Sequence, residues 1–169
     1  MDNTNTRLFN CQQMFRHACA FSDCADFAMK ELDSQKTSVE WYTTPATVNS
    51  AFACEVYLKT LLVFYNIRMK KAHKLKELYE LLPEDDKECI KRETLIHYGR
   101  GWKDGFGMER LEHISDAFVK WRYNYEYVPE KLSNMQIDIG FLNAFRNTLR
   151  DVCCFQLFHV KWDEYNSLN

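Results

Sequence analysis

The chain has 169 residues, a length typical of one domain with a substantial core. Its 46% hydrophobic and 27% charged residues exclude a disordered or low-complexity chain. Only five glycines and three prolines are present, too few for the many turns of a β-sandwich or β-barrel. The net charge of −2 excludes a general nucleic-acid coat protein, so any site for a polyanion must be local.

The first two predicted helices cover about 10–33 and 45–66. Apolar residues recur in both at helical spacing. Thr44 followed by Pro45 predicts the start of the second helix, with the threonine as N-cap and the proline in the first turn. Because this second helix is apolar nearly all round, we expect it at the centre of a helical bundle.

The rest of the chain continues the helical pattern, with glycine and proline marking the boundaries. The later predicted elements are two short helices on either side of Pro83 (73–82 and 84–98), a glycine-rich loop (99–107), a helix through Leu111 that ends near Pro129, and a last helix (137–160). Residues 1–169 therefore form a single all-α domain in this prediction, an up-and-down helical bundle of four long helices plus a short helical pair.

The cysteines and the polar start of the chain bear on compartment and cofactors. The seven cysteines contain no Cys-x-x-Cys pair, and the Cys/His spacings of zinc sites are absent. This pattern favours reduced, mostly buried thiols in a cytoplasmic protein, and we expect no metal and no cofactor. The first ten residues are polar, and Glu55 and Lys59 interrupt the most apolar segment, so we expect neither a secretory leader nor a membrane span.

Glu55 and Lys59 are the only charges between residues 45 and 67, and their i, i+4 spacing places them on one helix face. Charges on a mostly buried helix must be paired, because an isolated buried charge is costly. Two interpretations remain open. The pair is either a satisfied ion pair at the rim of the bundle, or it points into a cleft and orients a ligand or a basic residue.

The segment around Arg122 combines charges with aromatic rings. Arg122 and Glu126 lie next to the apolar stripe of Trp121 and Tyr125, and Tyr123 follows the arginine directly. An arginine held between rings suits bidentate binding of a phosphate. Equally, Arg122 can meet Glu55 across a helix interface, as an ion pair without a ligand.

A basic stretch, with no acidic residue between positions 68 and 76, follows the central helix. It contains Arg68, Lys70, Lys71, His73, Lys74 and Lys76. Positive charges after a helix C-terminus favour the macrodipole, which accounts for some of them. Their number also suits a surface that faces phosphate groups.

Three segments, taken in order, resemble the HEPN domain family (higher eukaryotes and prokaryotes nucleotide-binding). They are Ala51-Phe-Ala-Cys-Glu-Val-Tyr-Leu-Lys59, then His73-Lys-Leu-Lys-Glu-Leu78, then Trp121-Arg-Tyr123. The resemblance spans roughly residues 10–160. It implies an all-α up-and-down bundle, commonly a homodimer, associated with nucleotide or RNA biology.

Many proteins of that family are metal-independent ribonucleases with an Arg-x4–6-His motif on the last helix, where the arginine stabilises phosphate and the histidine transfers protons. Here the last helix has Arg146 and Asn147, but Asp151 stands where the histidine is expected. Arg92 and His97 have the expected spacing, although they lie in an earlier helix. On this resemblance, Arg146, Asn147, Arg92 and His97 are the candidate catalytic residues.

Because no histidine follows Arg146 at the expected distance, the sequence favours a non-catalytic HEPN-like module that binds a nucleotide, RNA or a protein partner. Its expected ligand-binding residues are Glu55, Lys59, His73, Arg122, Tyr123 and Glu126. The alternative is a metal-independent ribonuclease of a toxin–antitoxin or phage-defence system, with His97 or His159 supplied across a dimer interface. A third hypothesis is a structural, antitoxin-like partner protein. The 12 Phe, 9 Tyr and 4 Trp favour a homodimer, because a small bundle does not hide so many rings.

Overall fold

The computed structural model describes residues 3–33, 39–68, 73–99, 108–123 and 137–168. The regular elements in these ranges are all α-helices, which confirms the predicted all-α bundle. They are α1 (Asn3–Asp33), α2 (Val39–Phe64), α3 (Leu75–Glu80), α4 (Glu84–Tyr98), α5 (Met108–Ser115), α6 (Ala117–Arg122), α8 (Ile139–Phe158) and α9 (Trp162–Leu168). Within the described ranges, none of these helices has the length and apolar character needed to cross a membrane.

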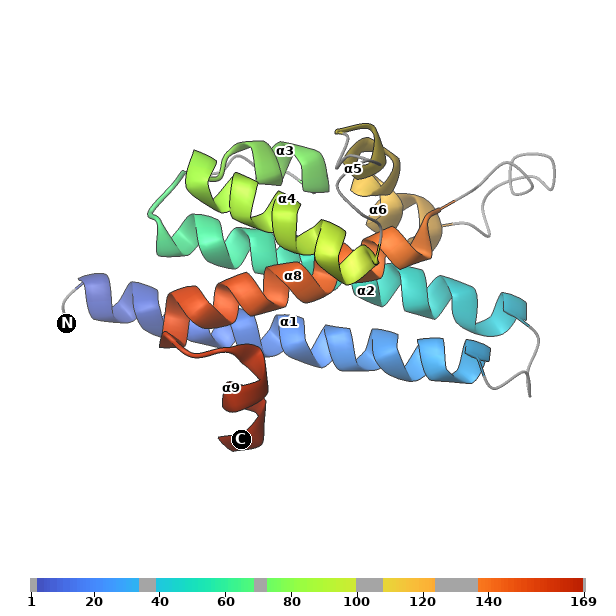
Figure 1. The fold of residues 1–169 in the computed structure, drawn as a ribbon, viewed down its shortest axis with the longest axis horizontal. Helices are drawn as coiled ribbons and strands as arrows, with labels where there is room; N and C mark the ends of the chain where they lie inside the picture. Colours follow the sequence, from blue (N-terminus) through green and yellow to red (C-terminus); the bar gives the residue numbers. More distant parts are fainter. Residues whose placement is uncertain (1–2, 34–38, 69–72, 100–107, 124–136, 169) are drawn as a thin grey trace.

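Helices α1, α2, α4 and α8 form the body of the bundle and alternate in direction along its long axis (Figure 1). Helix α8 packs on α1 and α2 on one side and on α4 on the other. The short helices α3 and α6 lie against α2, and α9 folds back at the end of α8 (Figure 1). Helix α8 therefore borders both the interior of the bundle and the groove beside α4.

Helix α2 occupies the centre, as its all-round apolar sequence predicts. It contacts α1, α3, α6 and α8, and its buried residues include Tyr57, Leu58, Leu61 and Leu62. Helix α1 packs closely along it through small and aromatic side chains such as Ala18 and Phe15. Burial of this continuous apolar surface is the main force that holds the helices together.

The start of the central helix differs from the prediction. Helix α2 begins at Val39, so Pro45 lies inside the helix rather than in its first turn. Because Pro45 has no N–H and lies beyond the first turn, the helix loses the hydrogen bond that this residue would donate to the carbonyl four positions earlier. The Asn49 amide donates to the Pro45 carbonyl oxygen at 2.8 Å and adds a local bond there.

The helix expected from Leu111 to near Pro129 is also different, because the chain breaks at Asp116 between α5 and α6. Asp116 has φ −97° and ψ 8°, outside the range of regular helix. Next to the break, the Ser115 hydroxyl accepts a hydrogen bond of 3.0 Å from the Lys76 N–H. This N–H lies in the first turn of α3, where it has no partner within the helix. The stripe of apolar residues is thus shared by two short helices, and residues 124–129 lie outside the described part.

Helices α4 and α8 each end at a residue with a left-handed backbone conformation. Gly99 ends α4 with φ 69°, as the glycine cluster predicts, while residues 100–107 lie outside the described part. His159 ends α8 with φ 59°. The chain turns there into α9, a helix that the sequence analysis did not predict because no glycine or proline marks its start.

Candidate ligand-binding pocket

Glu55, Lys59 and His73 meet at one carboxylate oxygen. Lys59 Nζ donates to Glu55 Oε1 at 2.6 Å, and His73 Nδ1 lies 2.9 Å from the same oxygen. Glu55 is only 2% exposed, and its Oε2 is buried without a hydrogen-bond partner among the described residues. The cluster ties α2 to the segment that leads into α3, so the geometry gives these residues a structural task at the bundle's edge.

Arg122 does not reach this cluster. Its guanidinium lies over the Phe118 ring at 4.7 Å and over the Tyr123 ring at 4.4 Å, and it donates to the Tyr123 hydroxyl at 2.5 Å. Within the described ranges, Arg122 forms no ion pair with Glu55. Glu126 lies outside the described residues. The structure therefore joins Glu55 to Lys59 but does not bring Arg122 to them in a shared groove.

Arg146, the leading catalytic candidate on the last helix, is buried at 2% exposure. It forms an ion pair with Asp26 of α1 and donates to the Ser50 hydroxyl of α2 at 3.1 Å. A weaker bond joins it to the Oδ1 of Asn147 at 3.5 Å. Its guanidinium thus links α1, α2 and α8 inside the bundle, where these contacts stabilise the fold.

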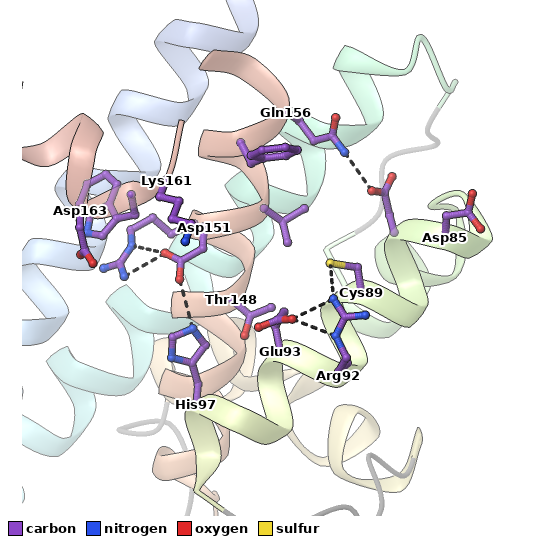
Figure 2. A pocket seen from close by; sticks show the side chains of 15 residues that line it. Asp85, Cys89, Arg92, Glu93, His97, Thr148, Asp151, Gln156, Lys161 and Asp163 are labelled. Atoms are coloured by element: carbon purple, nitrogen blue, oxygen red, sulfur yellow. Dashed lines mark hydrogen bonds and ion pairs between the residues drawn. The ribbon is translucent and has the colours of Figure 1, made fainter. Parts of the chain in front are cut away.

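A cavity with a volume of about 730 Å³ lies between α4, α8 and α9 (Figure 2). Such a volume falls in the range of small-molecule and peptide-anchor pockets. Its charged lining residues are Asp85, Asp86, Arg92, Glu93, His97, Arg150, Asp151, Lys161 and Asp163. Apolar surface comes from Val152, Phe155 and Trp162. We refer to this cavity as the α4–α8 pocket.

One wall of the pocket is a charged chain that crosses from α4 to α8. His97 Nε2 lies 3.1 Å from Asp151 Oδ2, and Arg150 Nη2 lies 3.1 Å from Asp151 Oδ1 (Figure 2). The Arg150 guanidinium is also stacked over the Trp162 ring at 4.4 Å, which anchors α9 on α8. Asp151 stands where the resemblance predicts a histidine, and its carboxylate contacts a histidine of another helix, His97.

The α4 side of the pocket also contains Arg92, Glu93 and Cys89. Arg92 Nε donates to Glu93 Oε1 at 2.9 Å, and its Nη2 lies 3.8 Å from Cys89 Sγ (Figure 2). Burial raises the pKa of the Cys89 thiol, and the opposing effect of Arg92 is smaller. Cys89 is therefore a neutral thiol near pH 7 and a poor nucleophile.

The far end of the pocket is acidic. Gln156 donates to Asp86 Oδ1 at 3.2 Å (Figure 2). Asp85 and Asp163, which also line the pocket, form no ion pair within the described part of the chain. No group of three or more His, Cys, Asp or Glu side chains in the described ranges has the arrangement of a metal site.

The structure therefore brings together Arg92 and His97 from the sequence candidates and separates them from Arg146, Asn147 and the Glu55 cluster. Sequence reasoning missed Arg150, Phe155 and Trp162. Phe155 offers the one local signal that could have been used, because it lies off the apolar stripe of α8 and is 56% exposed. Comparisons with protein-family models, curated proteins and solved structures gave no match for this chain.

Proposed function

We propose that this chain is a non-catalytic helical binding module, HEPN-like in the order of its motifs, that docks a protein partner in the α4–α8 pocket. The partner inserts an apolar side chain with a basic residue beside it. The observation that carries the proposal is the exposed Phe155 ring in a pocket of about 730 Å³ whose surplus charge is negative. Apolar contact supplies the binding energy, and the carboxylates select the charge of the partner.

The charge balance favours a basic partner over a nucleotide or RNA. Arg92 and Arg150 are already neutralised by Glu93 and Asp151. Asp85, Asp86 and Asp163 then remain, against the single cation Lys161. A polyanion would have to displace existing ion pairs and approach these carboxylates, both of which oppose binding.

The non-catalytic part of the proposal rests on the residues that chemistry would need. Arg146, the arginine of the HEPN-like motif, is buried in contacts with α1 and α2 and is not presented to solvent. The thiol of Cys89 has a raised pKa and does not supply a nucleophile.

A library of random short peptides, panned against the immobilised protein, tests this proposal. We expect selected peptides to share a large apolar residue flanked by Lys or Arg. Phe155→Ser should weaken the binding of a selected peptide by at least about tenfold, because an exposed aromatic anchor commonly dominates such contacts. Phe27→Ser is the matched control, since Phe27 is 60% exposed on α1 and lies outside the pocket.

Two outcomes would contradict the proposal. One is equal loss of binding in Phe155→Ser and Phe27→Ser, which would indicate general stickiness. The other is selection of acidic peptides, or saturable binding of a short RNA that Arg92→Ala abolishes. Reversal of charge in Asp163→Lys should shift selection toward acidic peptides if the carboxylates read the partner's charge.

His97 gives one reason to keep a second candidate function, the metal-independent ribonuclease. Its ring is oriented by Asp151 at 3.1 Å, and Arg92 lies in the same pocket. A histidine held by a carboxylate can transfer protons near neutral pH, and an arginine can stabilise a phosphate. RNA cleavage in EDTA that is lost in both His97→Ala and Arg92→Ala would establish this function; wild-type protein that leaves RNA intact would eliminate it.

The predicted homodimer remains part of the proposal. Exposed Phe9 and Ile96 supply apolar surface of the kind that self-association covers. Sedimentation equilibrium at micromolar concentration should give the mass of two chains, and the mass of one chain would contradict it.

A further inference from the structure

A second cavity lies at the end of the bundle where α1 begins and α2 ends. It has a volume of about 510 Å³. Its described lining residues are Thr6, Arg7, Asn10, Val63, Asn66, Ile67 and Arg68. None of them lines the α4–α8 pocket, so this cavity is a separate feature. We refer to it as the two-arginine pocket.

The charge of the two-arginine pocket is wholly positive among its described lining residues. Arg7 and Arg68 are its charged residues, and neither forms an ion pair within the described ranges. The neighbouring basic residues behave differently. Lys76 lies 2.7 Å from Glu112, and Lys74 lies 3.8 Å from Glu77. Among the described residues of the basic stretch, Lys74 and Lys76 are therefore paired with acids of α3 and α5, whereas Arg68 has no acidic partner.

The backbone turn after α2 brings Arg68 to this cavity. Asn66 has φ 58°, and the Ile67 N–H donates to the Leu62 carbonyl at 2.8 Å. This pattern is a left-handed helix cap that satisfies the last carbonyl groups of α2 and turns the chain toward α1. These main-chain hydrogen bonds fix the turn that precedes Arg68, and Arg68 and Arg7 both line the cavity.

Neutral hydrogen-bonding groups complete the lining. Thr6, Asn10 and Asn66 contribute a hydroxyl and two amides to the same lining as the two arginines. An arginine fork matches phosphate oxygens in bidentate geometry, and hydroxyl and amide donors bind the remaining oxygens. Val63 and Ile67 add a small apolar wall beside the charges.

We propose that the two-arginine pocket binds the phosphate groups of a small phosphorylated molecule. Two guanidinium forks engage more oxygens than one carboxylate offers, which favours a phosphate or diphosphate over a carboxylic acid. Inorganic pyrophosphate and a nucleoside diphosphate share this chemistry. The inference is independent of the protein-docking function, because the two pockets have no residue in common.

Isothermal titration of the full chain with pyrophosphate, and separately with ADP, tests the inference in buffer of low ionic strength. We expect one saturable site for both. Arg68→Gln and Arg7→Gln should each weaken binding by at least about tenfold, as expected for loss of one of two bidentate contacts. Arg16→Gln is the matched control, an exposed arginine of α1 that does not line the cavity.

Arg68→Lys separates charge from geometry and should retain only part of the affinity, because a lysine provides a point charge without the fork. Circular dichroism of each variant shows whether the helices are intact, and the exposed Arg68 makes that variant the safer of the two. Tighter binding of ADP than of pyrophosphate would identify a nucleotide as the source of the phosphate, and equal binding would identify the phosphates alone. Absence of saturable binding, or equal weakening in Arg16→Gln, would overturn the inference.

Discussion

The junction around Arg146 and the α4–α8 pocket lie on opposite sides of the same helix, and both are built from arginine, aspartate and small polar groups. In the junction, Arg146 is 2% exposed and joins α1, α2 and α8. In the pocket, Arg150 and Asp151 belong to the same helix but face α4 and α9, beside an open cavity. Similar residues thus stabilise the fold at one place on α8 and line an open cavity at another.

The difference shows that residue type and spacing do not assign a role to a charge. Arg146 and Arg150 are four residues apart, yet only Arg150 borders the cavity. What decides the role is which element packs against that turn of α8: α1 and α2 at Arg146, and α9 at Arg150. Variants on the two sides should therefore separate stability from binding.

The largest expected effect is on stability at the junction. Arg146→Met removes a buried ion pair and the bond to Ser50, and should lower the free energy of unfolding by about 2–4 kcal/mol. The partial exposure of Asp26 (43% of its side chain) keeps the loss below that of a fully buried pair. Arg92→Ala, on the pocket side, should stay within about 0.5 kcal/mol of wild type. Urea unfolding measures both, and similar losses in the two variants would break the comparison.

A smaller effect is expected at the Glu55 cluster. Lys59→Met leaves the buried Glu55 carboxylate with His73 as its remaining partner and should cost about 1–3 kcal/mol. Adding Glu55→Met removes the orphaned charge, so the double variant should return to within about 1 kcal/mol of wild type. Urea unfolding of the two variants tests this. A double variant less stable than Lys59→Met would instead show that the carboxylate itself is needed.

The smallest effect concerns the reactivity of Cys89. Because burial raises its pKa, less thiolate exists at a given pH than in a free cysteine of pKa about 8.5. Alkylation by iodoacetamide should be several-fold slower than that of free cysteine near pH 7.5 and should continue to rise at pH values above about 8.5. Mass spectrometry of the modified peptide gives the rate. A plateau already near pH 8 would contradict the raised pKa.

Much of the fold could be predicted because its signals are local. Pro83 and Gly99 mark α4 at both ends, and the all-round apolar pattern of α2 identifies the central helix. The break at Asp116 could not be predicted from local signals. It accompanies a bond between Ser115 and Lys76, residues far apart in sequence. The start of α9 at a left-handed histidine leaves no compositional mark either.

The site was harder to predict for the same physical reason. Its defining contact joins His97 to Asp151 across 54 positions, and no pattern within one helix encodes it. The Glu55–Lys59 pair was predictable from its i, i+4 spacing. Arg122 was not, because aromatic rings on its own segment hold it away from Glu55.

Protection of Cys89 from alkylation tests the central claim most directly, because this thiol lines the α4–α8 pocket while the exposed Cys24 lies against another cavity on α1. The two rates are measured by mass spectrometry with and without a basic, apolar peptide selected from the library. The account predicts that the saturating peptide slows modification of Cys89 several-fold and leaves the rate at Cys24 unchanged. An unchanged rate at Cys89 under saturating peptide, or protection of Cys24 instead, would show that the partner binds elsewhere.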